Sequence, residues 1–283
     1  MMVSPDRYST LIRLFGAPKP LIGNIHVAAL PGTPRYRKED ISAIVARAVA
    51  DAVAYQRGGM NGVLVENHGD IPFLKPECLG PEVIAAMAVG AKAVKDAITI
   101  PIGINLLANG AIGALAIGKA SGASFIRVNQ WVNAYVSNEG VIEGEAAKIL
   151  RYRKMIEADS IAIFADVHVK HGSHAIVGDR SVSEQARDVE FFDADVAIAT
   201  GNRTGDEIPD DEIAAICNGT RLPVIAGSGV TVANAGHILA KVDGAIVGSS
   251  LKIGGVWWNP VEQSRVAALV ELVGNLRSSV NRD

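Results

Sequence analysis

Three side chains that could transfer protons stand at alternating positions near the middle of the chain. Asp166, His168 and Lys170 follow or end the apolar run at residues 161–167 and are separated by single valines. A strand that continues through this segment places carboxylate, imidazole and ammonium on one side. Such groups serve general acid–base catalysis, and we expect Asp166 or Glu66 to act as the base and His168 or Lys170 as the acid.

The same side chains suit two other roles. His26, Glu66, Asp166 and His168 offer the mixture of nitrogen and oxygen donors that Zn, Mn or Fe accept, which makes a divalent metal cofactor an alternative hypothesis. A purely structural layer is the third, with Asp166 pairing with Lys170 or orienting His168. An imine-forming Lys170 would need to lose its hydration, and its place beyond the apolar run favours a solvated lysine instead.

Two apolar runs near the C-terminus, residues 224–226 and 245–247, each end in glycine and serine. Glycines let the backbone turn sharply and bring bare N–H groups close to a ligand. In a (β/α)8 barrel the loops after strands 7 and 8 often form a phosphate site. We therefore expect a phosphorylated small-molecule ligand here, although two turns that bind nothing would have the same pattern. The predicted binding residues are Gly227, Ser228, Gly229, Gly248 and Ser249.

Further polar and aromatic residues follow the predicted strands. Asn105 and Asn129 could hydrogen-bond to sugar hydroxyls or to the edge of a base, or could cap loop backbone as Asn often does. Lys252 lies close enough to the second glycine turn to neutralise a phosphate, and a solvated lysine is equally compatible with the pattern. Trp257 and Trp258 could shield the phosphate or pack in the hydrophobic core, and we favour the core.

Eight short apolar runs supply the strands that would position these groups, and segments with helical character lie between them. Residues 41–56, for example, place apolar side chains at the helical period of 3.6. This alternation predicts parallel strands with right-handed crossovers. Eight units favour a closed α/β TIM barrel over a doubly wound sheet, since no G-x-G-x-x-G follows the first run. The runs are residues 21–27, 62–66, 102–106, 125–128, 161–167, 196–199, 224–226 and 245–247.

Composition and charge narrow the class of protein. The 283 residues are 49% hydrophobic and show no linker, which predicts a single domain over 1–283 with its core at about 21–273 and a short extension at 1–20. A net charge of −3 argues against a nucleic-acid partner. The sequence contains no run of about 18 uncharged apolar residues, so we expect no transmembrane segment. Cys78 and Cys217 lie far apart in sequence and form no C-x-x-C motif, which fits a reducing, cytoplasmic location. We also expect a homo-oligomer.

Several of these motifs together resemble the BtpA/SgcQ family, over residues 21–273. The motifs are HVAALPG at 26–32, VEN at 65–67, GIN at 103–105, FIRVN at 125–129, DVHVKH at 166–171 and DGAIVGSSLK at 243–252. The resemblance implies a TIM barrel of the ribulose-phosphate-binding kind, with its phosphate site at the two glycine turns. It implies no particular reaction. The family is named after photosystem I biogenesis in cyanobacteria, and other members look like sugar-catabolism proteins.

Two hypotheses about function follow. The first is an enzyme of carbohydrate metabolism that acts on a phosphorylated sugar or nucleotide-like molecule as an isomerase, epimerase or lyase. The second is a non-catalytic biogenesis or assembly factor that uses the barrel as a scaffold. Because one fold hosts many functions, the fold alone does not decide between them.

Overall fold

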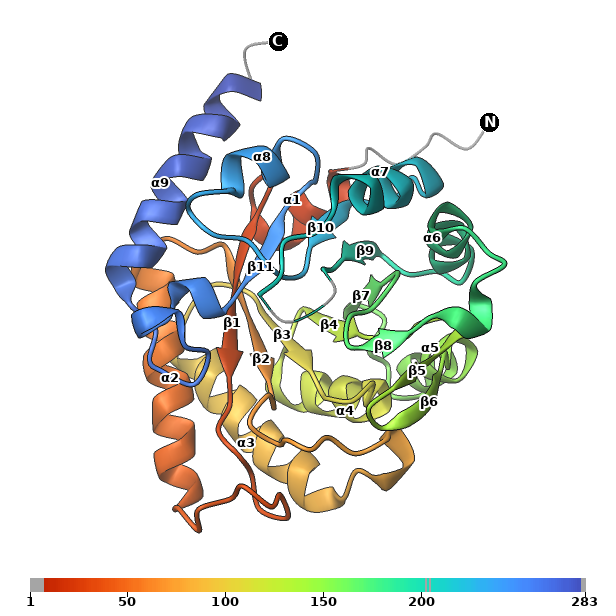
Figure 1. Cartoon of the computed structure of the whole chain (residues 1–283). Coiled ribbons are helices and arrows are strands. Elements are labelled where there is room, and N and C mark those ends of the chain that lie inside the picture. Colours follow the sequence, from red (N-terminus) through yellow and green to blue (C-terminus); the bar gives the residue numbers. More distant parts are fainter. Residues whose placement is uncertain (1–7, 202, 204, 281–283) are drawn as a thin grey trace.

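Eight parallel strands close into a barrel in the computed structural model, which describes residues 8–201, 203 and 205–280 (Figure 1). All eight apolar runs of the sequence form barrel strands, so the predicted (β/α)8 barrel is confirmed. Residues 1–7 of the predicted N-terminal extension lie outside the described residues. In order around the barrel the strands are β1 (Leu21–His26), β2 (Gly62–Glu66), β3 (Ile102–Asn105), β4 (Phe125–Val128), β7 (Ala162–Asp166), β9 (Val196–Ala199), β10 (Val224–Ala226) and β11 (Ala245–Val247).

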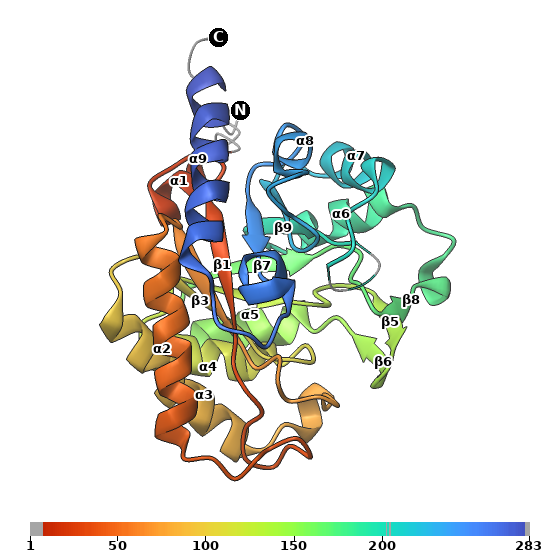
Figure 2. The same ribbon diagram turned by 60° about the vertical axis from the view of Figure 1, so that its left-hand side comes forward.

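Helices cover the outside of the barrel, as Figures 1 and 2 show. Their apolar faces and the outward-facing strand residues form the larger core. The last helix, α9, contacts both α2 and α8 and so completes the ring where β11 meets β1. The helices are α2 (Ile41–Arg57), α3 (Pro81–Ala97), α4 (Ala111–Ser121), α5 (Ala146–Met155), α6 (Val182–Phe191), α7 (Asp210–Gly219), α8 (Ala235–Leu239) and α9 (Gln263–Val280).

A short helix before the first strand, α1 (Ser9–Phe15), closes one end of the barrel. Its Leu11 and Phe15 join the inward-facing strand residues in a second, smaller core. The Phe15 ring packs edge-on against Phe125 at 5.6 Å and lies beside Gly62, the first residue of β2. The end of the barrel where the strands begin is therefore filled, and a ligand must enter where the strands end.

A small antiparallel sheet stands beside the barrel mouth, and the sequence did not reveal it. It pairs β5 (Ala134–Ser137) with β6 (Gly140–Glu143) and with β8 (Gly172–Ser173). These strands lie in the loops after β4 and β7, on the lower right of Figure 1. They lengthen the wall of the mouth on that side.

Candidate functional site

The carboxyl ends of the strands surround a cavity of about 840 Å³. That volume lies within the range of ligand sites for small molecules. Most of the residues singled out from the sequence line it, and they come from seven of the eight strand ends. They are His26, Glu66, Asn105, Asn129, Lys170, Gly227, Ser228, Gly229, Gly248 and Ser249.

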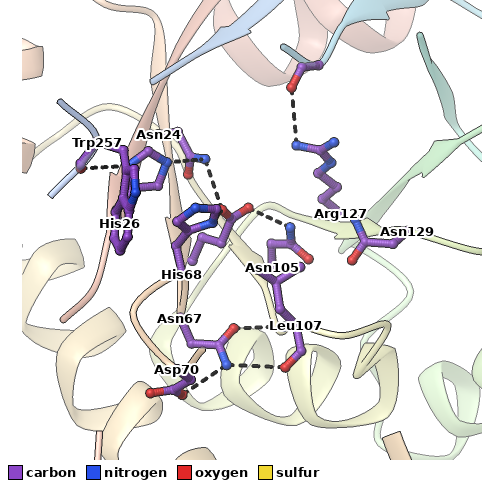
Figure 3. Close-up of polar contacts among 12 residues, drawn as sticks. Asn24, His26, Asn67, His68, Asp70, Asn105, Leu107, Arg127, Asn129 and Trp257 are labelled. Carbon is purple, nitrogen blue, oxygen red and sulfur yellow. Dashed lines mark hydrogen bonds and ion pairs between the residues drawn. The ribbon is translucent and has the colours of Figure 1, made fainter. Parts of the chain in front are cut away.

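Glu66 at the end of β2 has three polar partners in this cavity, Asn24, His68 and Asn105, which are labelled in Figure 3. Asn105 Nδ2 donates to its Oε2 at 2.6 Å, while Asn24 Nδ2 and His68 Nδ1 lie 3.3 and 3.0 Å from its Oε1. Burial alone would raise the pKa of Glu66, but the hydrogen bond and charge of His68 hold that pKa well below its usual range. Glu66 is therefore a carboxylate at neutral pH and a weak general base.

His26 at the end of β1 has its tautomer set by a backbone carbonyl. Its Nδ1 lies 2.9 Å from the carbonyl oxygen of Trp257, which only accepts, so Nδ1 carries the hydrogen. Nε2 then presents a lone pair, and Asn24 Nδ2 lies 3.2 Å from it. Burial and the charge of His68 lower the pKa of His26 to about 3, so its ring is neutral.

Asn67 fixes the loop that carries His68. Its side chain is fully buried, and Asn67 Oδ1 accepts from the backbone N–H of Leu107 at 2.7 Å. Its Nδ2 donates to Asp70 Oδ2 at 3.0 Å and to the Leu107 carbonyl at 3.2 Å (Figure 3). The loop after β2 is thus tied to the loop after β3, and His68 is held over the cavity.

Asp166 at the end of β7 forms an ion pair with an arginine that the sequence interpretation missed. Arg127 Nε and Nη2 each donate to one Asp166 oxygen at 3.0 Å, and Asn129 Nδ2 adds a third bond at 3.2 Å. Asp166 and Arg127 are only 2% and 3% exposed. Such a bidentate, buried pair orders the barrel interior, and it leaves Asp166 poorly placed to take a proton. The position of Arg127 inside the apolar run 125–128 could have predicted this ion pair, because a buried charge needs a partner.

The structure separates His168 from Asp166. β7 ends at Asp166, so strand alternation does not extend to positions 168 and 170. His168 Nδ1 instead lies 2.8 Å from Glu212 Oε1 on α7, and its ring stacks obliquely on His174 at 3.8 Å. His168 lines a neighbouring hollow of about 430 Å³. The prediction that Asp166, His168 and Lys170 converge on one side of a strand is therefore wrong.

Lys170 lines both hollows, in contrast to the solvated lysine expected from the sequence. Burial, followed by the positive charge of Arg127, lowers the pKa of Lys170 from 10.5 to about 8. A pKa near neutrality leaves a usable fraction of the free amine at physiological pH. Among the predicted acid–base groups, Lys170 therefore has the environment that suits proton transfer best.

A different group of metal donors replaces the set expected from the sequence. Within the described part of the chain, His26, Glu66 and His68 place one donor atom each within 4.8 Å of one another. Asp166 and His168 lie outside this group, because Arg127 and Glu212 hold them elsewhere. The mixture of two imidazoles and a carboxylate is one that divalent transition metals accept.

The two glycine turns lie side by side at the mouth, because β10 and β11 are neighbours in the barrel. Gly229 has φ +71°, and a Cβ there would lie 2.0 Å from the Asp206 carbonyl oxygen, so only glycine fits. The Gly227 N–H donates to the Ala199 carbonyl at 2.7 Å and belongs to the barrel rather than to a ligand. A Cβ on Gly248 would come within 3.0 Å of the His26 ring.

Lys252 and the tryptophans do not have the roles expected of them. Lys252 is 1% exposed and pairs with Asp51 of α2 at 2.5 Å, so it neither reaches a phosphate nor is solvated. Trp257 packs its edge against the His68 ring at 4.6 Å, and Trp258 is 68% exposed. Both line the cavity instead of filling core.

Comparisons with known proteins place the chain among barrel proteins. The model of the BtpA family matches residues 17–275. An uncharacterized protein of Archaeoglobus fulgidus is 42% identical over 252 residues, covering 89% of this chain and 97% of that protein. The photosystem I biogenesis protein BtpA of Synechocystis is 35% identical over 263 residues, covering 92% and 90%. A Mycobacterium tuberculosis tryptophan synthase structure covers 95% of this chain and 98% of its own at a TM-score of 0.62 and 16% identity, a likeness of fold alone.

Each helix in the described part of the chain is too short or too polar to traverse a bilayer.

Proposed function

The chain belongs to the BtpA family, and on that premise we propose that it is an enzyme acting on a phosphorylated small molecule at the barrel mouth. The observation that carries the proposal is a single cavity lined by both glycine turns and also by Glu66 and Lys170. Backbone amides at the turns would hold the phosphate, and the rest of the substrate would extend across the mouth. Arg127 Nη1 donates to the Gly227 carbonyl at 3.4 Å, so a guanidinium that is paired with Asp166 lies next to the first turn.

Lys170 is the proposed proton-transfer group. Its lowered pKa makes the free amine available, while Glu66 stays ionised and Asp166 stays bound to Arg127. Proton transfer next to a carbonyl or hydroxyl is the first step of isomerisation, epimerisation and aldol cleavage. The proposed reaction therefore belongs to the isomerase, epimerase or lyase type, with a sugar phosphate or nucleotide-like substrate.

A negative charge introduced at the second glycine turn tests whether phosphate binds there. Ser249→Asp is expected to weaken binding of phosphate esters at least tenfold, because a carboxylate about 4 Å from a phosphate costs up to ~4 kcal/mol at an effective dielectric constant of about 20. Thermal shift and calorimetry with orthophosphate, ribose 5-phosphate and glucose 6-phosphate give the measurement; a bound ligand at 100 times its Kd adds about 2.7 kcal/mol of stability. Ser249→Asn is the matched neutral control. Equal binding by both variants would move the phosphate away from this turn.

A non-catalytic assembly role is the second candidate, and the 35% identity to the Synechocystis photosystem I biogenesis protein favours it. Such a scaffold needs no ligand in the cavity. Failure of wild-type protein to bind any phosphate ester, together with a defined protein partner that Trp258→Ala releases, would support this role over the enzyme. Trp258 is the natural probe because its side chain is exposed at the rim of the mouth.

A further inference from the structure

We propose that His26, Glu66 and His68 bind a divalent transition-metal ion on the wall of the cavity. The parallel pairing of β1 with β2 sets His26 directly opposite Glu66, and His68 follows two residues later. One donor atom from each lies within 4.8 Å of the others, and all three residues line the cavity. An ion bound by all three would therefore face the space in which a substrate sits.

The surroundings of these donors are those of a prepared metal site. A metal-binding imidazole usually donates its other N–H to a carbonyl or carboxylate, which fixes the ring and aims the lone pair. His26 has this arrangement, with Nδ1–H toward the Trp257 carbonyl and Nε2 on the other side of the ring. Glu66 is oriented likewise by the Asn105 amide on its other oxygen. The donors are thus held in place before any ion arrives.

A buried amide oxygen provides an independent sign of a cation. Asn24 is 7% exposed, and its Oδ1 has no hydrogen-bond partner among the described residues. Leaving such an acceptor unsatisfied costs about 1–3 kcal/mol. Its Nδ2 lies 3.2 Å from His26 Nε2 and 3.3 Å from Glu66 Oε1, between two proposed ligands. A half-turn of this amide about its Cβ–Cγ bond would exchange the positions of the two atoms and present Oδ1 as a fourth donor.

The donor types select the class of ion. Two imidazole nitrogens with carboxylate and amide oxygens suit Zn²⁺, Mn²⁺ or Fe²⁺, whereas Mg²⁺ and Ca²⁺ prefer oxygen alone. An ion held by three or four protein ligands keeps positions open for a substrate oxygen, which it would polarise as a Lewis acid. Gly248 of the second glycine turn lies next to the His26 ring. An ion bound by His26 would therefore be close to the proposed phosphate site.

Metal titration of the full chain tests this site without any substrate. After treatment with EDTA, wild-type protein is expected to bind Zn²⁺ or Mn²⁺ with one ion per chain in calorimetry, and Mg²⁺ far more weakly. His26→Gln and His68→Gln are each expected to weaken binding by more than the ~10–100-fold that loss of an outer-shell partner causes. His168→Gln is the matched control, because this histidine lies at the mouth but outside the group. Thermal melts in EDTA check that all variants fold alike.

Two results would overturn the assignment. One is a wild-type chain that binds neither Zn²⁺ nor Mn²⁺ stoichiometrically. The other is wild-type affinity in both His26→Gln and His68→Gln. If, in that case, only His168→Gln lost affinity, the ion would bind in the neighbouring hollow instead. Because no phosphate compound enters the titration, its outcome is separate from that of the proposed phosphate seat.

Discussion

Asp166→Asn is expected to destabilise the barrel by about 3–5 kcal/mol, since removing one partner of a buried ion pair leaves the other charge uncompensated. Arg127 is 3% exposed and both of its bonds to Asp166 are 3.0 Å long, so the variant would leave the guanidinium enclosed beside a neutral amide. Urea denaturation followed by circular dichroism measures the change in the free energy of unfolding. The effect should appear without any ligand present.

Two further variants separate this effect from a general sensitivity to losing a carboxylate. Asp210→Asn removes the exposed partner of Lys241 and His237 and should change the free energy of unfolding far less than Asp166→Asn does, because solvent screens exposed ion pairs. Arg127→Met combined with Asp166→Asn should recover part of the stability, because no buried charge remains. An Asp166→Asn variant as stable as wild type would instead return Asp166 to the role of a free catalytic carboxylate.

Lys170→Met is expected to lower turnover by about 10²–10⁴-fold, the usual contribution of a general acid or base. The substrate in this assay is the phosphate ester that binds best to the wild-type chain. The wild-type rate should rise with pH to a plateau with an apparent pKa of about 8, as the ammonium of Lys170 loses its proton. Lys148→Met, on the exposed face of α5, is the control. Full turnover in Lys170→Met would remove this residue from the reaction.

The same lysine predicts how stability depends on pH. Its pKa in the folded chain, about 8, lies below the ordinary value of 10.5, so between these values the unfolded chain binds more protons. Stability should therefore rise with pH across this window, whereas below pH 8 folding carries the cost of the enclosed ammonium. The rise should be absent in Lys170→Met. Equal pH profiles for the two proteins would show that Lys170 is solvated.

The barrel could be predicted because its strands are buried on both faces. Parallel strands covered by helices appear in sequence as short apolar runs, and each of the eight runs was long enough to be recognised. The glycine turns could be located for a related reason, since their backbone conformation demands glycine at Gly229. These features depend on local sequence, so one chain suffices to find them.

The side-chain arrangement depended on contacts that local sequence does not contain. The end of β7 at Asp166 is set by the barrel, and alternation beyond that point predicted a convergence that is absent. His68 and Asn24 come into the site through the pairing of β1 with β2, a relation between residues about 40 positions apart. Helix α1 is only seven residues long, which is too short for the helical period of its apolar residues to be recognised, so its role in closing the barrel was not predicted.

A crystal structure of the chain with bound tungstate, or with the best-binding phosphate ester, tests the central claim most directly. We expect the anion to lie between the turn at Gly227, Ser228 and Gly229 and the turn at Gly248 and Ser249, with the remainder of an ester directed toward Lys170 and Glu66. An anion found only outside this cavity, with the turns unoccupied at saturating ligand, would contradict the proposal that the barrel mouth is a phosphate-dependent active site.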